Sequence, residues 1–396
     1  MDYPGVWILL GTFAVAFVGA MVMTPFCIWM APKIGAIDIP KDERRMHEKP
    51  MPRFGGLAIF VGVNLALGVF LSFDIRVGGV MLGGLLMYLL GIWDDLRGLP
   101  AKGKLLGQIV AALVVCGFGL RIEFVTNHFT AQLGEDHLFM AGAISWFITV
   151  LWIVGITNTM NLMDGLDGLA SGVAAIAALS IAYTAYIHGY YLGTLGMLAL
   201  AGGALGFLPY NFHPARIFMG DGGSLFLGFM LATMSMVEPA KGATVVAVMV
   251  PVLVLGLPIF DTAFAILRRA IRHRPIMEAD KGHLHHRIMA AGMGQQRTVL
   301  TMYAISAVMG IAAVLFSRDL FLETGGLFLI AVTLVYIFLT DATVLLPTLK
   351  GVNVRKLERR EKSEEVQLRE SLKEKIEQVD SEEWEIEETQ NREGRI

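Results

Sequence analysis

The sequence predicts an all-α, polytopic integral membrane protein with about eleven transmembrane helices. Of its 396 residues, 55% are hydrophobic and 17% are charged, and the mean hydropathy is +0.60. Soluble domains carry charge on about a quarter of their residues. Apolar runs long enough to cross the hydrocarbon core as helices recur along the chain. Basic residues are also distributed unevenly between alternate connections, which predicts an orientation.

Eleven apolar runs are the predicted crossings. The run nearest the N-terminus is too long for the core of a signal peptide and follows Asp2 rather than basic residues, so we expect it to be retained as a crossing. The runs lie near residues 6–31, 55–73, 77–93, 105–120, 142–158, 169–187, 190–208, 224–237, 243–266, 298–317 and 322–346.

The orientation follows from the connections between these runs. Connections 32–54, 94–104, 159–168, 209–223 and 267–297 hold 17 Lys and Arg residues, whereas the opposite connections hold four. Short basic loops stay in the cytoplasm. We therefore expect the N-terminus outside, the C-terminus in the cytoplasm, and residence in the inner (plasma) membrane.

Two domains are predicted, a transmembrane domain at 1–349 and a charged cytoplasmic tail at 350–396. In the tail, Leu368, Leu372, Ile376 and Val379 recur at helical spacing among charged residues, which indicates either a solvated amphipathic helix or a self-associating one. A homodimer is left open. The net charge of -3 shows no basic surplus, and we expect no nucleic-acid partner. The two cysteines lie in apolar runs and predict no disulfide framework or zinc site.

Acidic residues gather at the predicted cytoplasmic ends of the crossings. Carboxylates near a membrane are costly unless they are paired, hydrated or metal-bound. We therefore expect a polar site at this face, and we expect the acids on the outer side to be solvated. The inner acids are Asp94, Asp95, Asp164, Asp167, Asp221 and Asp261.

Three segments around these acids suggest ligand binding. The pair Asp94-Asp95, close to Lys102 and Lys104, either shares a proton, cation or phosphate or simply caps a helix. Residues 158–168 combine two asparagines, two aspartates and two glycines without a basic residue, which favours a ligand loop over an Asp-Gly turn. Asp221 lies in a glycine turn before a helix, where backbone amides can hold phosphate and the carboxylate magnesium; a plain helix start capped by Ser224 is the alternative.

The last cytoplasmic loop is rich in arginine and histidine. His283, His285 and His286 lack the spacing of a common zinc set, and phosphate contacts suit the basic setting, which includes Arg268, better than a metal site. Asp261 lies deeper, in a helix interrupted by prolines, and is either part of a functional cavity or of a structural salt bridge.

Taken together, five motifs resemble those of the polyprenyl-phosphate N-acetylhexosamine-1-phosphate transferases. They lie at 52–56 (Pro-Arg-Phe-Gly-Gly), 94–95, 161–168, 218–224 and 279–286, and span about two thirds of the chain. The likeness is greatest to the branch that uses UDP-N-acetylglucosamine for teichoic-acid or O-antigen polymers. The branch that uses UDP-MurNAc-pentapeptide typically has Pro-Thr-Met-Gly-Gly in the first motif, where this chain has Arg53.

The resemblance implies that a lipid phosphate oxygen attacks the β-phosphorus of a UDP-sugar and releases UMP, with undecaprenyl phosphate as acceptor. It implies magnesium, or manganese in its place, on Asp221, and a role for Asp94 or Asp95 in deprotonating or positioning the lipid phosphate, either as base or as covalent nucleophile. The implied catalytic residues are Asp94, Asp95, Asp221, His285 and His286; the implied metal ligands are Asp221, Asp94 and Asp95. The implied substrate contacts are Lys104, Asn161, Asp164, Asp167, Asn211, Phe218, Arg268 and His283.

A transporter is the alternative from another class, because broken helices and intramembrane acids also mark ion-coupled carriers. Carriers place their key polar groups near the membrane midplane, whereas the acids here gather at one face. No inverted repeat is visible in the sequence. The alternatives within the family are another UDP-N-acetylhexosamine or UDP-MurNAc-pentapeptide as donor.

Overall fold

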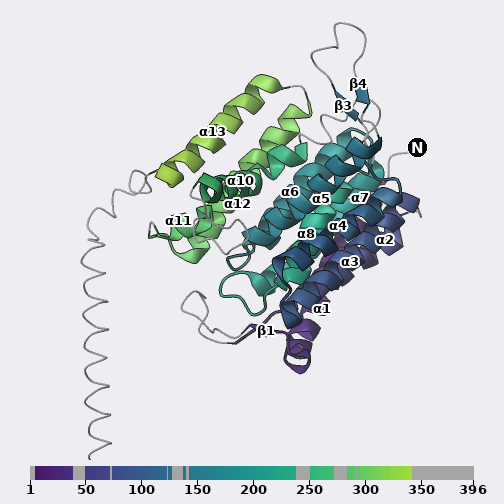
Figure 1. Cartoon of the computed structure of the whole chain (residues 1–396), viewed down its shortest axis with the longest axis vertical. Helices are drawn as coiled ribbons and strands as arrows, with labels where there is room; N and C mark the ends of the chain where they lie inside the picture. The colour runs from purple at the N-terminus through teal and green to yellow at the C-terminus, as the bar shows by residue number, and fades with distance from the viewer. Residues whose placement is uncertain are drawn as a thin grey trace, which may run out of the picture. The chain divides into compact units, whose positions relative to one another are not determined.

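The computed structural model is an assembly of helices with two very short antiparallel strand pairs (Figure 1). The described residues are 5–38, 50–71, 74–122, 124–126, 137–139, 142–237, 250–271, 283–290, 292–318 and 320–340. The chain divides into two units, Met1–Thr340 and Asp341–Ile396. The predicted tail at 350–396 lies outside the described residues, so its helix and its self-association stay predictions.

The elements appear in the following order. The helices are α1 (Val6–Ile34), α2 (Gly56–Phe70), α3 (Ile75–Arg97), α4 (Ala101–Gly117), α5 (Gly142–Met163), α6 (Leu169–Ile187), α7 (Tyr191–Asn211), α8 (Gly220–Met234), α10 (Gly256–Ile271), α11 (Leu284–Ala290), α12 (Gln295–Phe316) and α13 (Phe321–Thr340). Strands β1 (Ile37–Asp38) and β2 (Met51–Pro52) pair with each other, as do β3 (Phe124–Thr126) and β4 (His137–Phe139).

Among the described residues, six helices are long and apolar enough to cross a membrane: α1, α3, α5, α6, α7 and α12. The shorter α2 is also apolar. An all-α, multi-pass membrane protein is therefore confirmed. The count of eleven crossings and the orientation stay predictions.

Helices α1, α2 and α7 pack closely because small residues line their contact. On α7, a Cβ atom on Gly202 or Gly206 would overlap the backbone carbonyl oxygens of Phe13 and Phe17 on α1. Glycines spaced four residues apart on one helix face let helix backbones approach, which is a common way for membrane helices to associate.

Helix α8 is the centre of the bundle. It packs against α3 and α5, and every one of its residues except Asp221 is buried. Phe226 and Phe229 fill the space beside α3, since a Cβ atom on Gly83 or Gly84 would touch their rings. The one polar, accessible position of the central helix is therefore its first turn, at Asp221.

Helices α10 to α13 form a second group, drawn in green to yellow in Figure 1, and α12 packs it against α6. The short α11 buries Leu284 and Ile288, one helical turn apart, in an apolar cluster with Met163 and Leu166. This cluster holds the histidine motif beside the turn that follows α5.

Several helices extend beyond the predicted apolar runs. Helix α3 continues to Arg97, so Asp94 and Asp95 are helical rather than in a loop; α5 continues to Met163, and α8 begins at Gly220. Hydropathy marks the part of a helix that suits lipid, whereas backbone hydrogen bonding continues into the polar end. Prediction from the sequence therefore made these helices too short at the ends that hold the site residues. It also did not predict α11.

Candidate active site

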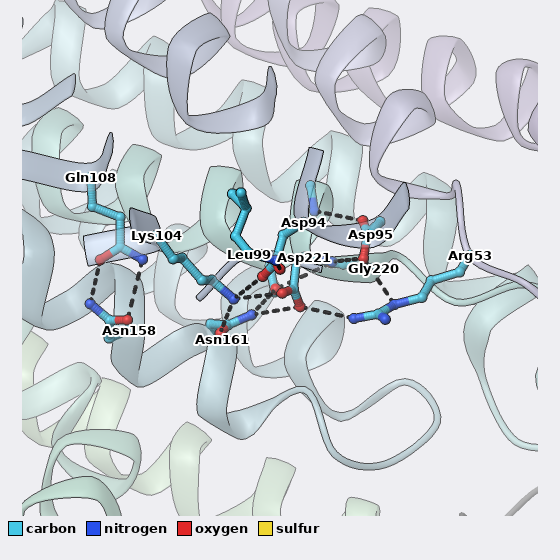
Figure 2. A network of polar contacts seen from close by, with 12 residues as sticks. Arg53, Asp94, Asp95, Leu99, Lys104, Gln108, Asn158, Asn161, Gly220 and Asp221 are labelled. Atoms are coloured by element: carbon cyan, nitrogen blue, oxygen red, sulfur yellow. Dashed lines mark hydrogen bonds and ion pairs between the residues drawn. The ribbon is translucent and has the colours of Figure 1, made fainter. Parts of the chain in front are cut away.

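A cluster of acidic and basic side chains forms where the end of α3 meets the start of α8 (Figure 2). Gly91 allows this meeting, because a Cβ atom there would overlap the backbone of Asp221 and Gly222. The contact brings Asp221 beside Asp94 and Asp95, which lie more than 120 residues earlier in the sequence. In the described residues these three acids therefore lie together, as predicted.

Lys104 on α4 joins two of the acids. Its Nζ lies 2.9 Å from Asp94 Oδ2 and 2.5 Å from Asp221 Oδ2, and it donates to Asn161 Oδ1 at 3.1 Å. A lysine ammonium has three donors, so all three are engaged. Burial would lower the pKa of Lys104, but the charges of Asp221 and Asp94 raise it above its usual value. The ammonium therefore stays charged, and a phosphate can reach it only by replacing one of these partners.

Arg53 holds the other side of the cluster and had no role predicted from the sequence. Its Nε lies 2.9 Å from Asp95 Oδ1, and its Nη2 donates to Asp221 Oδ1 at 3.0 Å. The signal that could have revealed it is that it is the basic residue of the 52–56 motif. The partner, 168 residues away, could not be inferred from spacing.

Asp95 is committed to the start of α8. Its two carboxylate oxygens accept hydrogen bonds from the backbone amides of Asp221 and Gly222, at 2.9 and 3.1 Å. A negative charge at a helix N-terminus satisfies free amides and is favoured by the helix dipole. Together with the ion pair to Arg53, these bonds use both oxygens of Asp95 and make it a positioning group for Asp221.

Asp221 is held from several directions. Asn161 Nδ2 donates to Asp221 Oδ1 at 3.1 Å and to Ser224 Oγ at 2.8 Å. Burial would raise the pKa of Asp221, but a hydrogen bond with Asp94 and the charges of Lys104 and Arg53 hold it below its usual range. Asp221 is therefore an ionised carboxylate. Ser224 does not cap α8, because its hydroxyl donates to Gly220 O.

Beside the cluster, the buried Gln108 pairs with the partly buried Asn158. Asn158 belongs to the 158–168 segment, whereas Gln108 was not singled out from the sequence. Gln108 Nε2 donates to Asn158 Oδ1 at 3.2 Å, and Asn158 Nδ2 donates back to Gln108 Oε1 at 2.6 Å. Each lies about one helical turn from a residue of the cluster, Gln108 from Lys104 on α4 and Asn158 from Asn161 on α5. The pair therefore fixes α4 against α5 where both contribute to the site.

The turn between α5 and α6 places its two aspartates differently. Burial raises the pKa of Asp164 to about 7, with a further contribution from the negative charge of Asp221 that Arg53 only partly offsets. Asp167 instead accepts hydrogen bonds through Oδ2 from His213 Nδ1 at 2.8 Å and from the Ala215 amide at 3.1 Å. Asp164 thus belongs electrostatically to the cluster, and Asp167 joins two loops.

The described contacts of Asn211 and Phe218 are hydrogen bonds that hold neighbouring segments of the chain together. Asn211 Oδ1 accepts from the Gly168 amide and from Ser171 Oγ, each at 3.1 Å, and its Nδ2 donates to Ile217 O at 3.0 Å. The Phe218 amide donates to Pro52 O at 2.8 Å. Their predicted substrate contacts stay predictions, and their described bonds hold the site's loops together.

The histidine motif is anchored by Asp261. His283 Nδ1 lies 3.0 Å from Asp261 Oδ2, and the Leu284 amide donates to Asp261 Oδ1 at 2.8 Å. His285 is 1% exposed, and its ring has no hydrogen-bond partner among the described residues and lies against Gly165. Burial, with a smaller effect of His286, lowers the pKa of His285 to about 3. His285 is therefore neutral, and any phosphate contact it makes is a hydrogen bond rather than an ion pair.

Parts of the motif fall outside the described residues. They are residues 279–282. The side chain of Arg268, which precedes the motif and whose backbone belongs to α10, is also outside the described residues. The predicted substrate contact of Arg268 stays a prediction. His286 lies beside His285, with ring centroids 4.2 Å apart.

The carboxylates suit a magnesium ion in part. Magnesium is commonly held by one or two carboxylates together with substrate phosphates and water. Asp221 and Asp94 fit this description, with 18% and 13% of their side chains exposed, whereas the oxygens of Asp95 are already committed and its side chain is 5% exposed. Within the described ranges, no three His, Cys, Asp or Glu side chains are arranged to hold a metal unaided.

Comparisons with known proteins show which proteins this chain is similar to. Residues 77–238 match the family model described as glycosyl transferase family 4. The chain is 41% identical to a probable undecaprenyl-phosphate N-acetylglucosaminyl 1-phosphate transferase of Bacillus subtilis, over 76% of this chain and 83% of the relative. It is 34% identical to a decaprenyl-phosphate N-acetylglucosaminephosphotransferase of Mycobacterium tuberculosis (76% and 82%), and 30% identical to a phospho-N-acetylmuramoyl-pentapeptide-transferase of Carboxydothermus hydrogenoformans (77% and 96%).

The chain is a multi-pass helical bundle with paired acids and bases at the helix ends, and it matches these relatives over most of its length. Together these findings define a membrane-embedded transferase. The chain belongs to the polyprenyl-phosphate N-acetylhexosamine-1-phosphate transferase family. It is an enzyme that transfers a sugar 1-phosphate to a polyprenyl phosphate, and the transporter alternative is wrong.

Proposed function

We propose that this enzyme transfers N-acetylglucosamine 1-phosphate from UDP-N-acetylglucosamine to undecaprenyl phosphate and releases UMP, at the cytoplasmic face of the inner membrane. The observation that carries the proposal is the ionised Asp221 at the first turn of α8, surrounded by Arg53, Lys104 and Asn161. The names of the relatives from Bacillus subtilis and Mycobacterium tuberculosis support this sugar. We expect the product to start a cell-envelope polysaccharide such as a teichoic acid or O-antigen.

In this reaction an oxygen of the lipid phosphate forms a bond to the β-phosphorus of the nucleotide sugar, and the bond from that phosphorus to the oxygen bridging to UMP breaks. Both reactants are anions, so the site must offset repulsion and the charge on the leaving group. Magnesium on Asp221, with Asp94 as second candidate ligand, would supply positive charge at the diphosphate. Lys104 and Arg53 supply the chain's own fixed positive charges beside it.

Asp94 is favoured over Asp95 as the group that faces the lipid phosphate. The oxygens of Asp95 are used by the α8 amides and Arg53, whereas Asp94 accepts from the Leu99 amide at 2.6 Å and contacts Lys104. A phosphate monoester has a second pKa of about 6 and is largely ionised near neutral pH. Asp94 would therefore orient the acceptor and the lysine more than it would remove a proton.

The test is an assay of UMP release by detergent-solubilised protein supplied with undecaprenyl phosphate, magnesium and one UDP-sugar at a time. We expect UMP from UDP-N-acetylglucosamine and expect Asp221→Asn to lower the rate by at least about a hundredfold, as loss of a group that stabilises transition-state charge does. Asp74→Asn is the matched control, because Asp74 lies at the opposite end of α3 and pairs with Arg76.

Other outcomes would separate the parts of the proposal. UMP from UDP-MurNAc-pentapeptide or another UDP-N-acetylhexosamine, but not from UDP-N-acetylglucosamine, would keep the reaction and change the donor. Near-normal turnover by Asp221→Asn would remove Asp221 from the reaction.

A further inference from the structure

Backbone hydrogen bonds join the segment that contains Arg53 to the segment that leads into Asp221. Its amide donates to Ala36 O at 2.8 Å, the Phe218 amide donates to Pro52 O, and the Gly55 amide donates to Phe218 O at 3.0 Å. These bonds fix the start of the Arg53 side chain relative to the first turn of α8. The Arg53 side chain as a whole is 33% exposed.

The two arms of the guanidinium differ in strength of attachment. The Nε arm meets Asp95, whose side chain is 5% exposed and whose oxygens are also tied to two amides of α8. The Nη2 arm meets Asp221 Oδ1, on a carboxylate that is 18% exposed. Ion pairs weaken as exposure to water increases. The contact between Nε and Asp95 is therefore the more stable one, and the contact between Nη2 and Asp221 is the one that can be broken.

A divalent cation bound through Asp221 Oδ1 would compete with the Nη2 arm for that oxygen. Asp221 Oδ1 already accepts from Arg53 Nη2 and Asn161 Nδ2, and Oδ2 contacts Lys104. Magnesium binds an oxygen at about 2.0 to 2.1 Å and demands octahedral geometry, so a lone pair of Asp221 must face it. A guanidinium on that lone pair occupies the direction, and its charge repels the incoming ion.

We propose that Arg53 is a built-in counter-ion that occupies the metal position at Asp221, and that metal binding releases its Nη2 arm to contact the diphosphate of the nucleotide sugar. This inference rests on the proposed function. With Nε still on Asp95, the freed arm turns towards a substrate anion, and guanidinium groups suit phosphate oxygens. Metal and donor binding are then coupled through one side chain.

The first experiment measures binding of Mn²⁺ alone to detergent-solubilised protein, from the electron paramagnetic resonance signal of free Mn²⁺. We expect Arg53→Gln to bind Mn²⁺ roughly tenfold more tightly than the unaltered protein, because one competing charge is gone. Arg97→Gln is the matched control, because it removes the same charge at an exposed position two residues after Asp95. We expect its Mn²⁺ affinity to be unchanged, and we expect Asp221→Asn to lose binding.

The second experiment measures binding of UDP-N-acetylglucosamine without lipid acceptor, so that no transfer occurs. In the unaltered protein we expect Mn²⁺ to raise donor affinity, and in Arg53→Gln we expect that gain to shrink several-fold because the freed arm is missing. Arg53→Lys keeps the charge but cannot span both carboxylates, so its Mn²⁺ affinity should be intermediate. Thermal unfolding of each variant checks that it is folded.

Failures of the two proposals are distinguishable. If Asp221→Asn loses Mn²⁺ but Arg53→Gln and Arg53→Lys bind it no more tightly than the unaltered protein, the role of Arg53 is overturned and the metal role of Asp221 stands. Equal tightening by Arg97→Gln would reduce the effect to overall charge and also overturn it. If no variant binds Mn²⁺, both the counter-ion role and the metal on Asp221 fail.

Discussion

At the scale of single residues, Asp164 is the clearest source of pH dependence. Its pKa is raised from 3.8 to about 7, so the folded protein favours its protonated form more than the unfolded chain does. Its contribution to stability is therefore fully present below about pH 4 and is lost as the pH rises through about 7. Above that pH, Asp164 adds an unfavourable negative charge beside Asp221.

Asp164→Asn should consequently raise the melting temperature at pH 8 and change it little at pH 5. The measurement is intrinsic fluorescence during heating of detergent-solubilised protein, in EDTA and without substrate, so that no bound cation offsets the charge. An equal shift of the melting temperature at both pH values would show that the effect comes from packing rather than from protonation. Asp74→Asn, which removes an acid far from the cluster, is the control.

Several residue roles could not be derived from the sequence because they depend on partners distant in the chain. The sequence predicted that Asp94, Asp95 and Asp221 lie at one face, because helix ends alternate between the two sides of a membrane. It could not predict that Asp95 caps α8, which requires the register of two packed helices. For the same reason Arg53 and the amide pair of Gln108 and Asn158 were not assigned.

At the scale of helices, the contact between α3 and α8 sets the geometry of the cluster. Gly91 faces the backbone of Asp221 and Gly222, so a methyl group there must push the two helices apart. Overpacking of a buried contact commonly costs about 1 to 3 kcal/mol. The displacement would also lengthen the bonds between Asp95 and the α8 amides, so Gly91→Ala should impair both stability and transfer.

The matched control for Gly91→Ala is Gly155→Ala on α5. Among the described residues, no atom beyond the backbone of its own helix lies within 4 Å of the position that a Cβ would take on Gly155. Alanine favours the helix over glycine by roughly 0.5 to 1 kcal/mol. We expect Gly91→Ala to lower the melting temperature and the rate of UMP release, and Gly155→Ala to leave both unchanged or slightly raise the melting temperature. Normal turnover in Gly91→Ala would show that the α3–α8 contact tolerates displacement.

Helix α11 illustrates what hydropathy cannot predict. Its seven residues are too few and too polar for an apolar run, yet Leu284 and Ile288 are buried and Asp261 accepts the Leu284 amide. This helix is stabilised by tertiary packing rather than by its own pattern. From the sequence, Asp261 was either part of a functional cavity or part of a structural salt bridge. In the structure, its described bonds hold the histidine motif in place.

At the scale of the whole molecule, the orientation in the membrane decides whether the site faces the cytoplasm, where nucleotide sugars are found. The prediction rests on 17 basic residues in one set of connections against four in the other. The polar cluster at Asp221 and the exposed Lys102 belong to the basic side, whereas His188, after α6, belongs to the other. Both native cysteines, Cys27 and Cys116, are buried and should not react with a reagent in water.

Labelling of single cysteines introduced at Lys102 and His188 can therefore be measured without a signal from the native cysteines. With a membrane-impermeant maleimide on intact cells, Lys102→Cys should be labelled only after the cells are permeabilised, and His188→Cys should be labelled at once. Because labelling of a folded loop depends on access as well as on side, permeabilised cells must label both positions. Labelling of Lys102→Cys in intact cells would reverse the orientation and place the acidic cluster, with Asp221, on the face away from the cytoplasmic nucleotide sugar.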